Sequence, residues 1–192
     1  MTLEEKQLRE IQNRVKKYLS ECTVLVKQKA VDVDFFLKNA DDSLQSAKCL
    51  FDVSAKHDYA GYENINGFLW VINASYYSMF YMARALLGHE GIKLKTELSI
   101  HLLVFDVLVH FFYITGKLQK QLVEHYAQAK EEAAELLGRQ KADELVQDYL
   151  YEKEKRATFT YETGIFAMQS KAKTSLDRSI KFNLEIRRII KS

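Results

Sequence analysis

The feature that most constrains the fold of this chain is the complete absence of proline from its 192 residues. Proline removes a backbone N–H and clashes with the preceding helical turn, so this chain lacks the strongest helix breaker. Only seven glycines are present to end helices or form tight turns. No alternation of apolar and polar residues is long enough to indicate a strand. The sequence therefore predicts an all-α fold.

Apolar residues recur at spacings of three and four along most of the chain, as they do on one face of a helix. Residues 65–88 are apolar almost all round, which favours a central position in the core. We predict an antiparallel up-and-down helical bundle of four to five core helices plus an extra N-terminal helix. The expected helices are 2–28, 32–56, 65–88, 97–114 (capped by Thr96), 118–137, 140–157 and 166–190, where 140–157 either stands alone or continues 118–137 after a kink near Gly138.

The first 30 residues are expected to form an accessory helix, and residues 31–192 the bundle itself. Thr2 and Glu5 have the spacing of a capping box at the start of this helix. Its apolar residues form a narrow stripe, which suits either a partner helix or packing on the chain's own domain. The stripe consists of Leu8, Ile11, Val15, Tyr18, Cys22 and Leu25.

Composition excludes several classes of protein. The net charge of +2 is too small to indicate a nucleic-acid-binding surface over the whole molecule. The segment MTLEEKQLRE is charged from its fourth residue and is no signal peptide, and polar residues interrupt the uncharged run 64–83, so we expect a cytoplasmic protein without a membrane span. Cys22 and Cys49 are expected to be reduced and buried, with a disulfide as the alternative.

Metal and cofactor sites are not expected. The five histidines lack the spacing of zinc ligands, and no glycine-rich phosphate loop is present. Asp106 and His110 lie four residues apart, which predicts a salt bridge at the bundle surface rather than a catalytic pair. The last helix carries seven basic residues and two acidic ones from position 171 on, which indicates a solvated face or a contact with phosphates or an acidic partner.

Asn73, Tyr77 and Arg84 form one polar stripe on the otherwise apolar helix 65–88. The stripe either forms an internal hydrogen-bond network or lines a groove in which Arg84 meets a phosphate. Arg84 and His89 also have the spacing R-x4-H, and an arginine and a histidine can together cleave RNA without metal. We expect Gly88 to end the helix between them.

The segment NASYYSMFYMARALLGHEGIKLKT (73–96) and the sequence TGKL (115–118) carry a family resemblance. Together they resemble HEPN domains, and more narrowly the small stand-alone archaeal and bacterial HEPN proteins encoded beside minimal nucleotidyltransferases. The resemblance covers about residues 32–190. Ala74 departs from it, since the family often has arginine there, and a short insertion precedes His101. The matching positions are Tyr76, Tyr77, Met79, Phe80, Ala83, Arg84, Ala85, Leu86 and Leu87.

The resemblance implies a helical bundle that dimerises, with a reactive Arg-x4-6-His motif near the start of the last conserved helix. Arg156 matches the arginine of that motif, and Tyr161 stands where a histidine would serve. Tyrosine has an unperturbed pKa of about 10, which makes it a poor base near neutrality, but it can donate a hydrogen bond or stack on a base. Arg156 is thus expected to contact phosphate, with Asn73, Tyr77 and Arg84 supporting the groove.

We therefore expect a homodimer that binds a nucleotide or RNA as one component of a two-protein HEPN–nucleotidyltransferase module of toxin–antitoxin type. One alternative is a metal-independent endoribonuclease toxin, in which Arg156 acts with Tyr161 or with a histidine from elsewhere in the dimer. A second alternative is a dimerisation scaffold without a ligand. The tyrosine at position 161 is the reason that binding is expected over cleavage.

Overall fold

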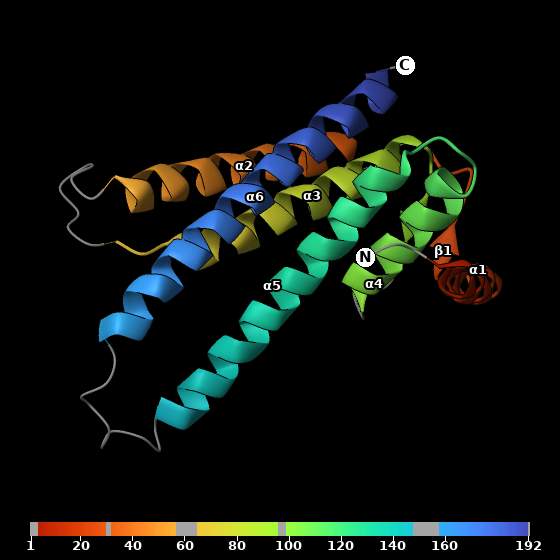
Figure 1. The fold of residues 1–192 in the computed structure, drawn as a ribbon. Coiled ribbons are helices and arrows are strands. Elements are labelled where there is room, and N and C mark those ends of the chain that lie inside the picture. Colours follow the sequence, from red (N-terminus) through yellow and green to blue (C-terminus); the bar gives the residue numbers. More distant parts are fainter. Residues whose placement is uncertain (1–3, 30–31, 57–64, 96–98, 148–157, 192) are drawn as a thin grey trace.

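The computed structural model describes residues 4–29, 32–56, 65–95, 99–147 and 158–191, and the side chains of these residues except 137–147 and 158–167. The described part is helical apart from one two-stranded pairing, which confirms the all-α class (Figure 1). The elements are α1 (Glu5–Ser20), β1 (Val24–Leu25), α2 (Val33–Ala55), α3 (Phe68–His89), β2 (Lys93–Leu94), α4 (Ile100–Leu108), a π-helical turn (Val109–Tyr113), α5 (Lys120–Gln147) and α6 (Thr158–Lys191).

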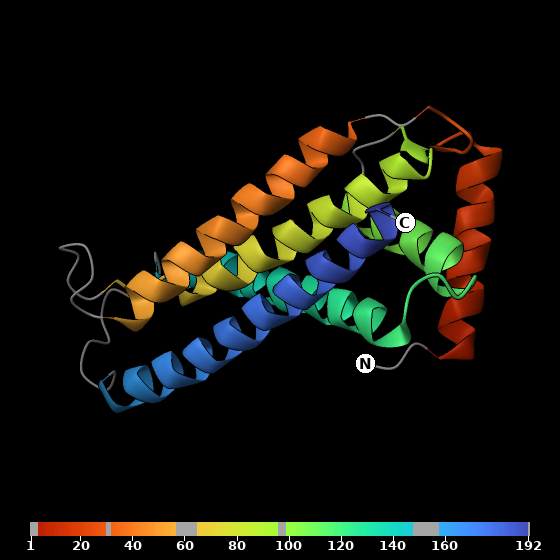
Figure 2. The same ribbon diagram turned by 90° about the horizontal axis from the view of Figure 1, so that it is seen from above.

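Helix α3 is the centre of the bundle and contacts α2, α4, α5 and α6. It can be buried on most sides because its residues are apolar almost all round, as the sequence predicted. Figure 2 shows α2, α3 and α6 running along the bundle, and α1 lying across one end against α4. Two hydrogen bonds join three of these helices: Ser78 Oγ donates to the carbonyl of Ala40 at 2.7 Å, and Asn183 Nδ2 donates to Ser78 Oγ at 2.7 Å.

The N-terminal helix is shorter than expected. It ends at Ser20, and the expected helical residues up to position 28 instead turn at Cys22 (φ 56°) and enter β1. β1 pairs antiparallel with β2, with Val24 opposite Leu94. The capping box at the start of α1 is formed by Glu4 and Gln7 rather than by Thr2 and Glu5, and Thr2 lies outside the described residues.

The apolar stripe of α1 packs on the chain's own core. Ile11 and Val15 are buried there, and Leu8 and Tyr18 pack against the same cluster. Cys22, the last residue but one of the expected stripe, is exposed, and so is Cys49. Both thiols are free, as expected, but the prediction that they are buried was wrong. Cys22 is exposed because the helix ends at Ser20, before it reaches this residue.

Other helix boundaries differ from the prediction by several residues. α4 begins at Ile100 after Ser99, and Thr96 lies outside the described residues. α5 continues through Gly138 to Gln147, because one glycine inside a helix costs only about 1 kcal/mol. α6 begins at Thr158, earlier than the expected residue 166. None of the described helices combines the length and apolar content that crossing a bilayer requires.

Candidate functional site

A hollow of about 380 Å³ lies between α2 and α3, and we call it the α2–α3 groove. On α3 its lining residues recur every three or four positions, with Asn73 and Ala74 adjacent, which places them on one face of the helix. None of the lining side chains that belong to the described residues is charged. They are Ser43, Ser46 and Leu50 from α2, and Trp70, Asn73, Ala74, Tyr77 and Tyr81 from α3.

Asn73 is the unusual residue of the α2–α3 groove. Its side chain is only 4% exposed, and neither Nδ2 nor Oδ1 has a hydrogen-bond partner among the described residues. Buried amides are nearly always paired, and an unpaired polar group costs about 1–3 kcal/mol of stability. Among the described residues, Asn73 therefore belongs to no internal hydrogen-bond network, and it lines a groove, which is the second of the two interpretations of the polar stripe.

Two aromatic side chains of the groove are substantially exposed. Trp70 is 52% exposed and Tyr77 is 37% exposed, which is unusual for side chains of this size. The ring of Tyr77 lies 6.2 Å from that of Tyr81 and 5.7 Å from the imidazole of His101. Trp70 is also the only tryptophan of the chain. The groove thus combines exposed ring faces with a buried amide.

Arg84, the third residue of the predicted stripe, does not line this groove. It lines a smaller cavity of about 60 Å³ near the C-terminal end of α3, together with Phe36, Lys29 and Lys93. Its guanidinium lies over the ring of Phe36, 4.2 Å from the centroid. At a rise of 1.5 Å per residue, Arg84 stands about 16 Å along the helix from Asn73. The structure brings Asn73 and Tyr77 together and sets Arg84 apart from them.

His101 supports the groove from α4. Its Nδ1 lies 2.8 Å from the hydroxyl of Tyr76, and its ring centroid lies 4.4 Å from that of Phe80. Burial lowers the pKa of His101, and the nearby positive charges of Lys130 and Arg84 lower it further. The imidazole is therefore neutral at pH 7 and packs as an aromatic ring behind Tyr77.

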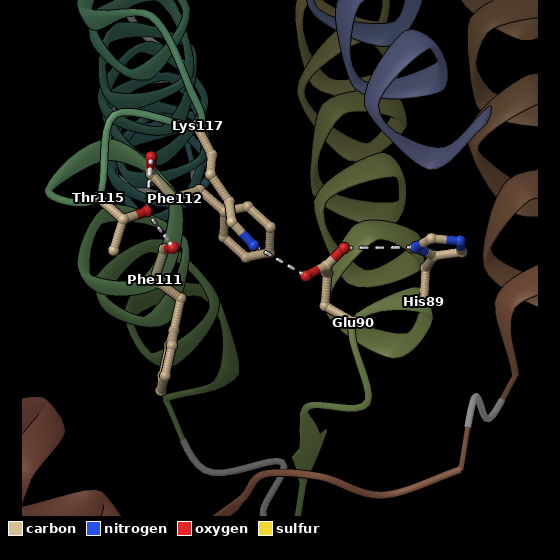
Figure 3. Close-up of polar contacts among 6 residues, drawn as sticks. All are labelled: His89, Glu90, Phe111, Phe112, Thr115 and Lys117. Carbon is tan, nitrogen blue, oxygen red and sulfur yellow. Dashed lines mark hydrogen bonds and ion pairs between the residues drawn. The ribbon is translucent and has the colours of Figure 1, made fainter. Parts of the chain in front are cut away.

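The pair Arg84–His89 is not arranged as the R-x4-H spacing suggested. α3 does not end at Gly88 but continues to His89. His89 Nδ1 lies 3.6 Å from Glu90 Oε1, and the other oxygen of Glu90 lies 3.2 Å from Lys117 Nζ (Figure 3). His89 thus lies beside the ion pair of Glu90 with Lys117, between the end of α3 and the turn before α5, whereas Arg84 packs over Phe36.

The expected salt bridge between Asp106 and His110 was also wrong. Asp106 is fully buried and accepts hydrogen bonds from Arg14 Nε at 2.6 Å, Arg14 Nη2 at 2.8 Å and the Tyr18 hydroxyl at 3.3 Å. The helix changes to a π-helical turn at Val109, which moves His110 off the i, i+4 register with Asp106. Among the described residues, His110 Nδ1 has no hydrogen-bond partner.

No family model, curated protein or solved structure matches this chain. The groove and the sequence resemblance are therefore the two sources from which function can be inferred. Within the described ranges, no group of three histidine, cysteine, aspartate or glutamate side chains could hold a metal ion.

The roles of two predicted site residues, Arg156 and Tyr161, stay predictions. Arg156 lies outside the described residues. Tyr161 belongs to α6, but its side chain is outside the described part of the structure. The basic residues of α6 are mostly engaged in ion pairs, for example Arg178 with Glu132 at 2.8 Å and Arg187 with Asp41 at 2.5 Å. These pairs favour a structural, solvated role for this part of α6.

Sequence reasoning missed most of the groove. Trp70 and Tyr81 could have been found, because they continue the spacing of Asn73 and Tyr77 along the same helix face. Ser43, Ser46 and Leu50 could not, because the periodicity of α2 does not say which of its residues stand beside the exposed face of α3.

Proposed function

We propose that this protein is an HEPN-like nucleotide- or RNA-binding protein and that its ligand occupies the α2–α3 groove. The observation that carries the proposal is the unpaired buried amide of Asn73 in the same groove as the exposed rings of Trp70 and Tyr77. Proteins that recognise unpaired bases stack them on aromatic side chains and hydrogen-bond their edges. The groove offers both kinds of contact.

The remaining parts of the proposal come from the resemblance to HEPN domains. Arg156 would contact phosphate and Tyr161 would donate a hydrogen bond or stack, and Arg84 would meet a phosphate beyond the groove. The protein would act in the cytoplasm as a homodimer and as one component of a two-protein module with a nucleotidyltransferase. Light scattering tests the dimer, since it should give twice the 22.4 kDa mass of one chain.

Binding can be measured by fluorescence anisotropy of a short, labelled single-stranded RNA, with EDTA present. We expect a saturable rise in anisotropy while the RNA stays intact. Tyr77→Ala should weaken binding roughly 5- to 150-fold, since one base–aromatic stack contributes about 1–3 kcal/mol. Phe35→Ala is the matched control, because the ring of Phe35 is 60% exposed but lies outside the groove. It should leave the affinity unchanged.

The same mixtures separate the alternatives when they are analysed on a denaturing gel. Cleavage of the RNA in EDTA that disappears in Arg156→Ala would replace the binding-only proposal with the metal-independent endoribonuclease. If neither RNA nor any nucleotide binds at millimolar concentration, the protein is a scaffold without a ligand.

A further inference from the structure

Among the described residues, the side chains that line the α2–α3 groove are uncharged, although 28% of the chain's residues are charged. A phosphate is normally held by arginine, lysine or several backbone N–H groups. The groove provides two serines, two tyrosines, a tryptophan and an asparagine instead, together with Leu50 and Ala74. Its volume of about 380 Å³ is within the usual range of small-molecule sites. The chemical group that fits it is planar, aromatic and uncharged.

The amide of Asn73 specifies the edge of that group. A side-chain amide presents a donor and an acceptor side by side, and in Asn73 both are unpaired among the described residues. Adenine presents a complementary donor and acceptor, its N6 amino group and N7, and asparagine binds this pair with two hydrogen bonds. A bound base would therefore give hydrogen-bond partners to a buried amide that has none among the described residues.

We propose that the α2–α3 groove is a recognition pocket for an adenine base, in which Asn73 binds the edge of the base and Trp70 and Tyr77 stack on its faces. This inference rests on the proposed nucleotide or RNA binding and names the base that the site takes. Both amide atoms of Asn73 are covered, so the base reaches them when a lining side chain turns. Trp70 and Tyr77 are the most exposed rings of the groove, and exposed side chains change rotamer within nanoseconds.

The position of Arg84 indicates which part of the ligand the groove binds. Arg84 lies about 16 Å along α3 from Asn73, which is further than the base and the phosphate of one nucleotide are apart. Arg84 would thus serve the phosphate of a neighbouring nucleotide in a strand. The groove itself is expected to bind the nucleoside adenosine about as well as adenosine monophosphate.

The single tryptophan makes this pocket directly observable. Trp70 is the only tryptophan of the chain, so tryptophan emission of the full-length protein reports on the α2–α3 groove alone. Adenosine, adenosine monophosphate, uridine and ribose 5-phosphate are titrated separately. We expect adenosine and its monophosphate to change the emission with similar dissociation constants, and uridine to bind about tenfold more weakly or worse. Ribose 5-phosphate should have no effect.

Two buried asparagines provide a matched pair of variants, because Asn73 and Asn183 are both 4% exposed. In Asn73→Leu the unpaired amide is removed, so the urea midpoint should stay or rise while the preference for adenosine over uridine disappears. In Asn183→Leu the hydrogen bond to Ser78 is lost, so the midpoint should fall while the preference is kept. Phe35→Ala serves as a second control, since that exposed ring lies outside the groove.

The outcomes separate this inference from the proposed function. If labelled RNA binds but adenosine leaves the emission of Trp70 unchanged, the adenine pocket is refuted and RNA binding stands. Equal affinity for adenosine and uridine in the wild-type protein, or an unchanged preference in Asn73→Leu, also refutes the pocket. If neither adenosine nor RNA binds, both proposals fall.

Discussion

Asp106 is a buried carboxylate in α4, and the cation that pairs with it comes from a residue 92 positions earlier in the chain. Arg14 of α1 holds the carboxylate with two hydrogen bonds, and Tyr18 donates a third. The carboxylate raises the pKa of Arg14, and burial raises the pKa of Tyr18, so both donors keep their protons at neutral pH. A buried ion pair of this kind adds little net stability, but losing one partner leaves the other uncompensated.

We predict that Arg14→Met lowers the free energy of unfolding by about 3 kcal/mol, because the carboxylate of Asp106 then stays buried without a cation. Urea denaturation at pH 7 measures this change. Arg9→Met is the control, since the pair of Arg9 with Glu5 is exposed and should contribute less than about 0.5 kcal/mol. Equal losses in the two variants would show that the Arg14–Asp106 contact is not what anchors α1.

Among single residues, the sequence predicted part of the polar stripe on α3, namely Asn73 and Tyr77, better than it predicted which charged residues pair. Asn73 and Tyr77 could be placed on one face of a helix from their spacing alone, and the groove contains both. The partner of Asp106 could not be predicted, because it depends on where α1 packs and on the π-helical turn beside His110. Nor does spacing reveal that the amide of Asn73 has no hydrogen-bond partner among the described residues.

Among the elements, the β1–β2 pairing depends on one glycine. Gly91 has a φ of +67°, and a Cβ there would lie 2.4 Å from the carbonyl oxygen of Gln28. The N–H of Gln28 also donates to the carbonyl of Gly91 at 2.9 Å. The backbones of the two segments therefore approach too closely for any side chain at position 91.

Gly91→Ala and Gly116→Ala form a matched pair of substitutions. Gly116 also has a positive φ, of +76°, but a Cβ there would have no neighbour within 4 Å. Gly116→Ala should cost only the left-handed backbone strain, about 1–2 kcal/mol. Gly91→Ala should cost clearly more, because the clash with Gln28 adds to that strain. Thermal unfolding of both variants tests this order, and equal losses would contradict the role given to the close approach.

The helices could be predicted as elements, but their ends could not. The strand residues Val24 and Leu94 are 70 positions apart in sequence, so their pairing leaves no trace in local periodicity. Residues 21–28 were therefore expected to be helical. The sequence leaves open whether residues 140–157 stand alone or continue 118–137, and α5 does run on through Gly138 to Gln147, because a glycine inside a helix costs only about 1 kcal/mol.

Three histidines packed in different parts of the molecule couple its stability to pH. Burial lowers the pKa of His101, His110 and His125, and nearby lysine or arginine charges lower it further. Their folded pKa values therefore lie below the unfolded value of about 6.5. Below that pH the unfolded chain binds more protons than the folded one, so stability falls as the pH decreases.

We predict that the urea midpoint is nearly constant above about pH 7 and falls as the pH decreases from about 6.5 towards the folded pKa values. Replacing His125 by glutamine should reduce this fall, because His125 faces Arg178 and Lys181 and its Nδ1 has no hydrogen-bond partner among the described residues. Urea titrations of both proteins at a series of pH values measure the difference. A midpoint that rises on acidification would overturn the assignment of these histidines as neutral.

For the whole molecule, the all-α class and the central place of α3 followed from the missing proline and the apolar surface of residues 65–88. The way in which the helices pack side by side did not follow from the sequence. Side-chain packing between distant segments decides which face of α2 lies against α3 and places α1 across the end of the bundle (Figure 2). The groove is a product of that arrangement, and for this reason only its α3 half could be read from the sequence.

The corner where α3 begins is closely packed against the end of α2, beside one wall of the groove. The N–H of Gly67 donates to Ser54 Oγ at 2.8 Å, and a Cβ at position 67 would lie 2.9 Å from that oxygen and 3.4 Å from Leu50. Leu50 is itself a wall of the groove. Because glycine has no side chain, the start of α3 can lie directly against the end of α2. A side chain at position 67 would have to displace Ser54 Oγ and would press on Leu50, so it would disturb one wall of the groove without replacing any residue that lines it.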